Sequence, residues 1–212
     1  MTDSQILAET LSTYGFVVTD EQCRLLRRYC EQLWNWNTRL NLTRHTDSEA
    51  FVTRDLNDTQ QLNNHLHSGE SVLDVGSGGG VPGIVLAILN QSLNISLSES
   101  TQKKAVALEA IVAELGLSIP VLSERAENIV RRQSFDTITA RAVAPLRKLL
   151  PWFQPQRHRI GRLLLVKGPS WQTECDEAQL AGLMKRVEVS VLTEYATVGR
   201  DGPGMIAEVR FR

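Results

Sequence analysis

The chain has 212 residues, of which 42% are hydrophobic, and a formal net charge of −1 at pH 7. This composition predicts a folded domain with a sizeable core and excludes a disordered chain, and the near-neutral charge excludes a global field that would attract nucleic acid or membrane. The cysteines and histidines lack metal-ligand spacing, no apolar run approaches about 20 residues, and the N-terminus lacks a signal-peptide pattern, so we expect a cytoplasmic protein with no metal and no membrane segment. A monomer is expected as well, although no sequence feature decides the oligomeric state.

Residues 1–67 are expected to form a helical extension, because their apolar residues recur at helical spacing and show no strand alternation. Thr19 followed by Gln22 has the form of a capping box, which predicts that a helix begins there. Trp34 and Trp36 on this helix are interpreted as packing residues, since platforms for stacked bases usually lie on sheets or in exposed grooves.

A second helix is expected from about Ser48, and a short charged stretch lies on it and just past its end. The charged residues on or just past this helix are Arg54, Asp55 and Asp58. Charges of this kind usually belong to a solvated face or to a salt bridge between helices. That is the interpretation adopted for all three.

The centre of the chain is a short apolar run at 71–75, which predicts a buried strand, followed by a glycine-rich turn. The turn contains Gly76, Gly78, Gly79 and Gly80, and then Val81, Pro82 and Gly83 lead into an apolar helix. Such a turn brings bare backbone and aligned N–H groups close to a ligand. The carboxylate of Asp74 beside the turn suits a cationic ligand, with an ammonium and a sulfonium, better than a pyrophosphate.

The form Asp-x-Gly-x-Gly-x-Gly at 74–80 resembles motif I of class I S-adenosylmethionine (SAM) methyltransferases. The same stretch also fits Gly78-x-Gly80-x-x-Gly83, the dinucleotide fingerprint, so nicotinamide binding is a rival interpretation. A glycine-rich turn that serves only strand–helix packing is a third.

From Ser68 onward, strand-like and helical runs alternate, which favours an α/β fold with a doubly wound, mostly parallel sheet. Strands are expected at 72–75, 95–97, 119–122, 135–139 and 163–166, and helices near 83–91, 102–116, 145–153 and 172–186. Two further strand-like runs, 187–195 and 205–211, are joined by a turn-rich link and predict an antiparallel pair at the C-terminal end. We therefore expect a Rossmann-like domain of seven strands at 68–212, after the helical extension at 1–67.

The second strand ends beside Glu99, about twenty residues past the glycine turn, where an acid can accept hydrogen bonds from ribose hydroxyls. Both SAM and NAD carry that ribose, and Glu99 could also serve only as a neighbour of the next helix N-terminus. Three features favour SAM as the cofactor: the chain has no room for a substrate domain, no His follows a strand, and Asp74 suits a cation.

A segment free of acidic residues lies between Asp136 and Glu174 and covers the ends of the fourth and fifth strands. Its basic residues are Arg141, Arg147, Lys148, Arg157, Arg159, Arg162 and Lys167. Without countercharges they would form a local anion-binding face, for which a phosphate backbone is the expected partner, although scattered solvated arginines are the alternative. Arg141 and Lys167 stand at strand ends and are the strongest candidates for the site.

These motifs together resemble the RsmG family, also called glucose-inhibited division protein B. The matching stretches are Asn41-Leu-Thr43, the glycine turn, Glu99-Ser-x-x-Lys-Lys104, Arg125-Ala-Glu127, Phe135-Asp136, Ala140-Arg-Ala142 and Lys167-Gly168. The resemblance implies a class I fold and SAM-dependent methylation of N7 of a guanine in 16S rRNA of the small ribosomal subunit. It also implies that Gly76 and Val81 line the SAM site, that Ala126 and Glu127 border the adenine, and that Arg141 lies between cofactor and guanine.

The chain departs from this family pattern at three places. The family usually has His where Asp55 stands, Asp-Ser where Glu99-Ser100 stands, and a lysine-rich finish where this chain ends Arg210-Phe-Arg212. These departures leave two alternatives open, namely a SAM- or RNA-binding module with altered catalysis and a methyltransferase for another acceptor.

The expected chemistry is simple, because N7 of guanine has a free lone pair and no proton, so no general base is required. Placement of N7 in line with the methyl group, with electrostatic tuning, should account for the rate. As a hypothesis, Arg141 and Lys167 bind O6 of the guanine and a nearby phosphate.

Overall fold

The computed structural model describes residues 3–199 and 201–212. Its N-terminal part is helical, as predicted, with α1 (Asp3–Thr13), α2 (Asp20–Asn37), α3 (Ser48–Ala50), the π-helical turn η1 (Phe51–Leu56) and α4 (Asn57–Asn63). The predicted capping box at the start of α2 is confirmed, because the Thr19 hydroxyl accepts the Gln22 N–H while the Gln22 side chain accepts the Thr19 N–H. Trp34 and Trp36 pack against the core, also as predicted.

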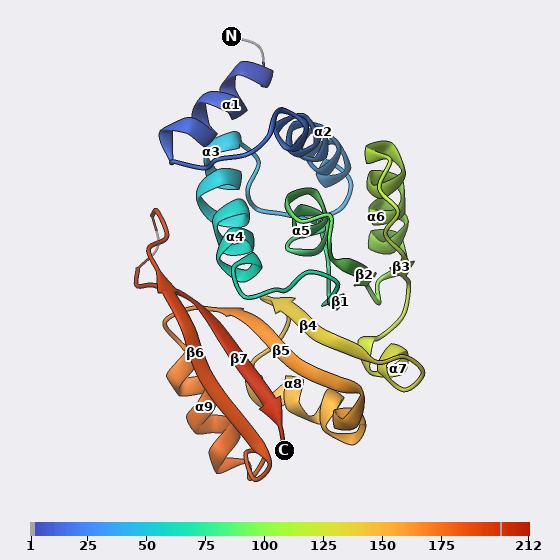
Figure 1. The fold of residues 1–212 in the computed structure, drawn as a ribbon, viewed down its shortest axis with the longest axis vertical. Coiled ribbons are helices and arrows are strands. Elements are labelled where there is room, and N and C mark those ends of the chain that lie inside the picture. The colour runs from blue at the N-terminus through green and yellow to red at the C-terminus, as the bar shows by residue number, and fades with distance from the viewer. Residues whose placement is uncertain (1–2, 200) are drawn as a thin grey trace.

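Seven strands form one sheet, which confirms the predicted fold (Figure 1). They are β1 (Ser71–Val75), β2 (Asn94–Ser98), β3 (Val121–Leu122), β4 (Phe135–Arg141), β5 (Ile160–Lys167), β6 (Val187–Tyr195) and β7 (Gly204–Phe211). Their order is β3-β2-β1-β4-β5-β7-β6. Strands β1 to β5 pair in parallel, and β7 lies antiparallel between β5 and β6. The predicted antiparallel C-terminal strand therefore exists.

The helices between the strands are α5 (Gly83–Leu89), α6 (Gln102–Leu115), α8 (Leu146–Phe153) and α9 (Trp171–Leu180). All four were expected, but the prediction that the last one runs to 186 was wrong. The chain turns at Gly182, which has a φ of +70°, and backbone hydrogen bonds from the following turn close the helix end. Two short elements were not predicted, α7 (Ala126–Val130) and the 3₁₀-helix η2 (Gln154–Arg159).

Helices cover both faces of the sheet, and alternate strand residues point to opposite faces. Val72, Leu164 and Val166 pack in one hydrophobic cluster with residues of α2, α4, α5 and α6, whereas Leu73 and Leu165 pack in the other with α7, α8 and α9. In Figure 1 the N-terminal helices accordingly lie together with α5 and α6, away from α8 and α9. The helical extension thus shares a core with the sheet, and the domain boundary at 67/68 stays a prediction.

The described residues contain neither a membrane-spanning helix nor a metal-binding cluster. No helix among them combines the length and the apolar character that a bilayer crossing requires. Within the same ranges, no group of three or more His, Cys, Asp or Glu side chains is arranged to hold a metal ion.

Candidate active site at the carboxyl ends of the strands

A cavity of about 680 Å³ opens where β4 and β5 end, on the side of the sheet where parallel α/β folds bind ligands. Arg141 is the last residue of β4 and Lys167 the last of β5, and both line this cavity. The structure therefore brings together the two residues that the sequence singled out. Arg44, His45 and Arg54 from the N-terminal part line it as well.

The guanidinium of Arg141 is held by two acids from the N-terminal helices. Its Nη2 lies 2.6 Å from Oδ1 of Asp55, and its Nη1 lies 3.1 Å from Oδ2 of Asp58. The other oxygen of Asp58 accepts a hydrogen bond of 2.7 Å from the Tyr195 hydroxyl. Burial by itself would lower the pKa of Arg141, but the charges of Asp55 and Asp58 outweigh it and raise that pKa. Arg141 is thus a fixed cation at the cavity wall.

The interpretation of Asp55 and Asp58 as a solvated face or a helix–helix salt bridge was wrong. Both side chains are buried, Asp55 with 0% of its surface exposed, and their partner is the end of a strand. Asp55 lies in the π-helical turn η1, a local geometry that often occurs at functional sites. The sequence signal that could have indicated this role is the spacing of three residues, which places two carboxylates on one helical face.

The ammonium of Lys167 is also held by neighbours. It lies 2.7 Å from Oε2 of Glu174 and donates a hydrogen bond of 3.2 Å to the Ala144 carbonyl. The same Glu174 oxygen accepts the N–H of Leu146 at the start of α8. Lys167 is therefore a nearly buried, ion-paired residue of the cavity wall, with 10% of its side chain exposed, and its role in catalysis stays a prediction.

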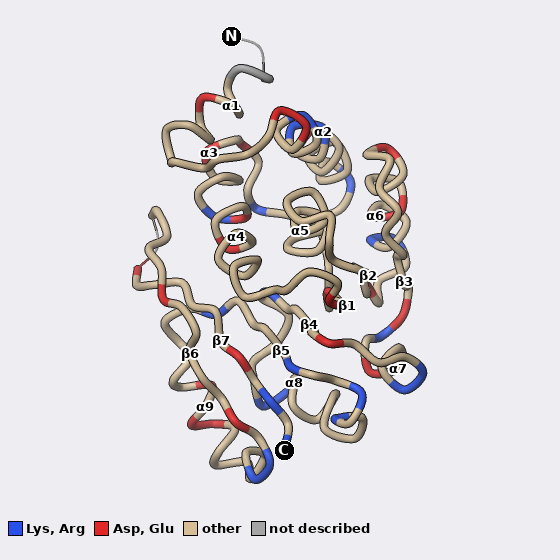
Figure 2. Tube along the Cα trace, in the orientation of Figure 1, with Lys and Arg blue, Asp and Glu red and all other residues tan. Residues whose placement is uncertain are grey.

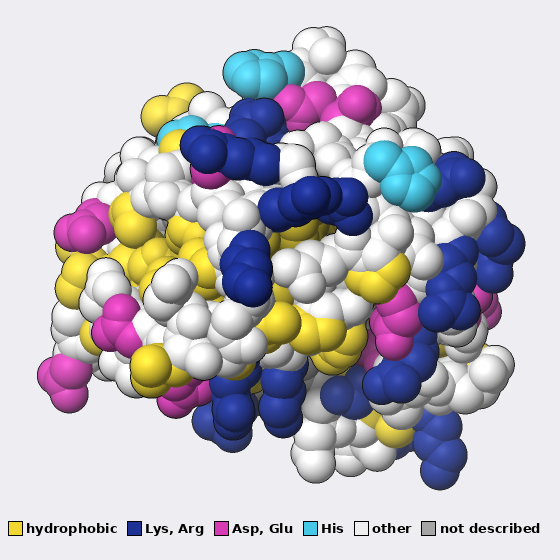
Figure 3. Space-filling view, turned by 90° about the horizontal axis from the view of Figure 1, so that it is seen from below, with side chains coloured by type: hydrophobic (Ala, Val, Ile, Leu, Met, Phe, Trp, Pro, Cys, Tyr) yellow, Lys and Arg dark blue, Asp and Glu magenta, His cyan; other side chains and the backbone are white. Residues whose placement is uncertain are grey.

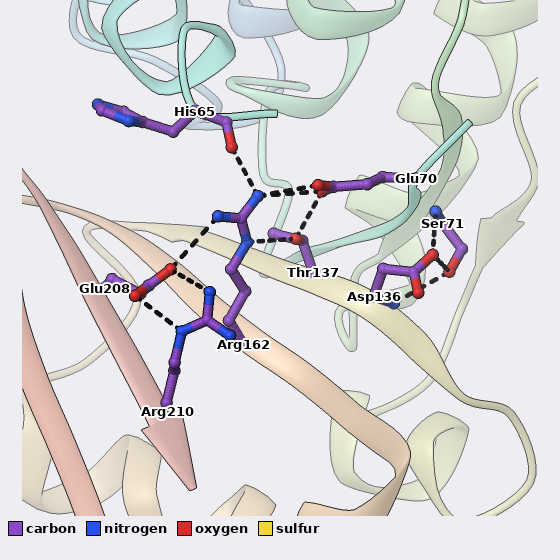
Figure 4. Close-up of polar contacts among 8 residues, drawn as sticks. All are labelled: His65, Glu70, Ser71, Asp136, Thr137, Arg162, Glu208 and Arg210. Carbon is purple, nitrogen blue, oxygen red and sulfur yellow. Dashed lines mark hydrogen bonds and ion pairs between the residues drawn. The ribbon is translucent and has the colours of Figure 1, made fainter. Parts of the chain in front are cut away.

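The predicted basic face without countercharges was wrong for four of its seven members, because distant acids pair with them. Besides Arg141 and Lys167, Arg147 pairs with Glu177 and Arg162 pairs with Glu70 and Glu208. Figure 4 shows Arg162 at the centre of a network in which it also donates to Thr137 and to the His65 carbonyl. Arg162 therefore joins β5 to β4, to β7 and to the end of the helical extension.

Two other basic residues of this segment, Arg157 and Arg159, lie in η2 before β5 begins. Because β5 has eight residues, that edge lies about 23 Å from the end of the strand at Lys167. Figures 2 and 3 show Lys and Arg around this edge and over the face seen from below. These arginines are therefore far from the cavity that holds Arg141.

A second, smaller cavity of about 80 Å³ adjoins the glycine turn. Gly76, Ala126 and Glu127 line it, together with Ser98, Ser100, Glu124, Arg125 and Trp152, and the contacts with SAM that the resemblance implies for the first three stay a prediction. Val143 lines both cavities, and it follows Ala142, whose φ of 55° is unusual for a residue with a side chain. Such local strain is common in loops that contact ligands.

The glycine turn has the geometry of a ligand cradle. Gly76 has a φ of +64°, and a Cβ there would lie 2.8 Å from a methyl of Val143, so a side chain would fill the cleft. The carboxylate of Glu99 accepts the Gly78 N–H at 3.1 Å and the Thr101 N–H at 2.7 Å, which fixes it beside the turn. Contact between Glu99 and a ribose stays a prediction, and these neighbours fit it.

Asp74 lies below the turn and lines neither of these two cavities. It is fully buried, and its two oxygens accept the Gly83 N–H at 3.2 Å and the Thr139 hydroxyl at 3.0 Å. Burial raises the pKa of this carboxyl to about 6, against the opposing effect of these hydrogen bonds. Asp74 therefore braces the turn from inside, and its direct contact with a cationic ligand stays a prediction.

Val81 and Gly80 do not line the small cavity either. Val81 packs against the hydrophobic core, and a Cβ at Gly80 would lie 2.6 Å from the Ile84 side chain. These positions shape the turn between β1 and α5, and their contact with a cofactor stays a prediction.

The fold, the glycine turn and the two adjoining cavities at the strand ends define a class I SAM-dependent methyltransferase. Similarity to solved structures agrees with this fold. An rRNA methylase from Streptococcus thermophilus superposes with a TM-score of 0.51 at 14% identity, covering 74% of this chain and 96% of that one. A precorrin-6y C5,15-methyltransferase from Geobacter metallireducens superposes with a TM-score of 0.54 at 12% identity, covering 83% and 96%.

Sequence similarity identifies the family. The chain belongs to the GidB family, rRNA small subunit methyltransferase G, whose model matches residues 22–201. It is 42% identical over 185 residues to the ribosomal RNA small subunit methyltransferase G of Rhodopirellula baltica, covering 87% of this chain and 80% of that protein. The protein of the same name from Thermotoga petrophila is 37% identical over 190 residues, covering 88% and 82%.

Proposed function

We propose that this protein transfers the methyl group of SAM to N7 of a guanine in 16S rRNA of the small ribosomal subunit, as a monomer in the cytoplasm. The observation that carries the proposal is the pair of adjoining cavities, one at the glycine turn and one at Arg141, with Val143 lining both. Family membership supports the rRNA acceptor, since relatives carry that activity in their names.

The residues around the small cavity fit SAM. Glu99 beside Gly78 would hold the ribose, and Ala126 and Glu127 would border the adenine. When bound, SAM supplies an electrophilic methyl group on a sulfonium. At about 80 Å³ the cavity is smaller than the several hundred Å³ of typical ligand sites, so the Val143 side chain in front of Gly76 has to move aside.

The residues around the large cavity would orient the acceptor. N7 of guanine bears no proton, so the protein need only hold the base, exclude water and place N7 in line for transfer. Arg141 would donate hydrogen bonds to the O6 edge or to a phosphate of the same nucleotide. The N–H groups of Arg141 are fixed before the acceptor arrives, because Asp55 and Asp58 hold the guanidinium, and such preorganisation favours catalysis.

The first test is mass spectrometry of small-subunit rRNA from cells with and without the gene, together with methyl transfer by the purified protein to 16S rRNA or small subunits. We expect one N7-methylguanosine to disappear without the gene and to return with the wild-type chain. An unchanged methylation map would refute the proposed acceptor.

The site is tested with Arg141→Lys, which keeps the charge beside Asp55 and Asp58 but loses the planar fork. Arg141→Ala is a weaker test, because it leaves two buried carboxylates uncompensated and would destabilise the fold by about 3–5 kcal/mol. We expect Arg141→Lys to lower kcat about 100-fold, as for loss of one preorganised donor. The matched control is Arg147→Ala, which removes an exposed, ion-paired arginine from the same segment and should retain activity. Wild-type activity of Arg141→Lys would remove Arg141 from the mechanism.

A further inference from the structure

In the ion pair between Asp55 and Arg141, only one of the two carboxylate oxygens contacts the guanidinium. One oxygen, Oδ1, contacts both Nη2 of Arg141 at 2.6 Å and Nδ1 of His45 at 2.8 Å. The other oxygen, Oδ2, is buried and has no hydrogen-bond partner among the described residues. Arginine–carboxylate pairs frequently use both oxygens in a two-pronged fork, and a bare buried oxygen is costly. Something therefore holds the carboxylate in its one-sided orientation.

His45 can hold the Asp55 carboxylate in this orientation, because hydrogen bonds fix the loop and the backbone that carry its imidazole. The Asn37 side-chain oxygen accepts the N–H groups of Leu42 and Thr43 at 2.8 and 3.0 Å, which fixes the loop before His45. The backbone of His45 is then held from both sides, since its N–H donates to the Thr43 hydroxyl and its carbonyl accepts the Trp34 indole N–H at 2.9 Å. The imidazole consequently contacts Asp55 from a backbone whose position is fixed by hydrogen bonds.

The direction of the hydrogen bond follows from its partner. An ionised carboxylate can only accept, so Nδ1 of His45 carries the proton and donates it to Oδ1. Because Oδ1 is bound to His45 as well as to Arg141, the carboxylate cannot turn to present both oxygens to Arg141 without straining or losing the hydrogen bond from His45.

We propose that His45 is a positioning residue for the acceptor site, which acts on Arg141 through the Asp55 oxygen that they share. By preventing a two-oxygen fork between Asp55 and Arg141, His45 leaves N–H groups of the guanidinium free to bind the RNA acceptor. This inference rests on the proposed function, in which Arg141 faces that acceptor.

The number of Arg141 N–H groups that remain free for the acceptor depends on how Asp55 binds the guanidinium. A guanidinium has five N–H groups, and the observed contacts engage one on Nη2 with Asp55 and one on Nη1 with Asp58. A fork with Asp55 would engage a further N–H and draw the guanidinium toward η1. Asp58 could not follow, because the Tyr195 hydroxyl holds its other oxygen. The fork would therefore both consume a donor and displace Arg141 from the cavity wall.

The test compares His45→Phe, which keeps a ring but no donor, with His45→Asn, which keeps an N–H near the position of Nδ1. For His45→Phe we expect at least a tenfold loss in kcat/KM for methylation of small ribosomal subunits, the effect of misplacing one charge-assisted donor. The Kd for SAM and the Tm should stay at wild-type values. His45→Asn should recover most of the activity, and a crystal structure of His45→Phe should show both Asp55 oxygens on the guanidinium.

Each outcome decides the inference. Wild-type kinetics in His45→Phe would overturn it, as would a one-sided Asp55–Arg141 pair in the structure of that variant. Equal losses in the Phe and Asn variants, with a lower Tm and weaker SAM binding, would also overturn it, since they indicate a merely structural role. Failure of the proposed function is distinct, because the wild-type protein itself would then leave small-subunit RNA unmethylated.

Discussion

The buried carboxyl of Asp74 makes the stability of this protein depend on pH in an unusual direction. Its pKa is raised from 3.8 to about 6, chiefly by burial. Between these values the folded chain keeps a proton that the unfolded chain has already released. Raising the pH through this window therefore favours unfolding, and the stabilising contribution of the protonated group is present below pH 3.8 and lost by about pH 6.

The expected change in free energy of unfolding follows from the difference between the Asp74 pKa values of the unfolded and folded chains. Each pH unit is equivalent to about 1.4 kcal/mol, so a window of roughly two units lowers the free energy of unfolding by about 3 kcal/mol. Asp74→Asn removes the titration and keeps the size of the side chain. The difference in free energy of unfolding, wild type minus Asp74→Asn, should thus fall by about 3 kcal/mol from pH 3.8 to pH 6 and then stay level.

Urea unfolding followed by tryptophan fluorescence, in buffers from about pH 2 to 8, measures this difference. Asp136→Asn is the control, because hydrogen bonds from the Ser71 backbone and side chain lower the pKa of Asp136 (Figure 4). The stabilising contribution of Asp136 is present above the usual pKa of an aspartate and is lost as the pH falls. The difference in free energy of unfolding, wild type minus Asp136→Asn, should therefore rise with increasing pH, opposite to the change expected for Asp74→Asn. A pH-independent difference for Asp74→Asn would refute the assignment of a buried, protonatable brace below the glycine turn.

Two further comparisons test the cradle and the network of Figure 4. Gly76→Ala and Gly78→Ala both place a side chain at positive φ, at a cost of about 1 kcal/mol, but only at Gly76 would the Cβ meet another side chain at 2.8 Å. We expect the Gly76 variant to lose more stability and more SAM affinity, and calorimetric titration that shows equal losses would contradict the cradle. Arg162→Met leaves the partly buried Glu70 without its partner and should cost about 3–5 kcal/mol in urea unfolding, against less than about 1 kcal/mol for Arg210→Met at the exposed edge. Similar values for the two arginines would show that the network is not a buried one.

The parts of the fold that the sequence predicts well are those set by local pattern. The strand at 71–75, the capping box at Thr19 and the glycine turn each follow from residues within a few positions of one another, and each is confirmed. The positions of Arg141 and Lys167 were also predictable, because each follows an apolar strand and parallel strands end at the same edge of the sheet.

Pairing between distant segments could not be predicted from those patterns. For four of the seven basic residues the countercharge lies outside their own segment: Glu70 and Glu208 reach Arg162, for example, and Glu174 reaches Lys167. An interpretation from local charge therefore overstated the anion-binding face. The same limit applies to Asp74, whose burial depends on the packing of β1 between β2 and β4 and not on its neighbours in the sequence.

The contact between Arg141 and the acids of the helical extension changes how the chain should be divided. Asp55 and Asp58 precede the predicted boundary at 67/68, whereas Arg141 lies more than 80 residues after them. The sequence pattern changes at that boundary because strands begin there, yet the cavity at Arg141 is built from both sides of it. A chain that began at residue 68 would lose both carboxylates that orient Arg141. The helical extension is therefore as much a part of the candidate active site as the strand ends are.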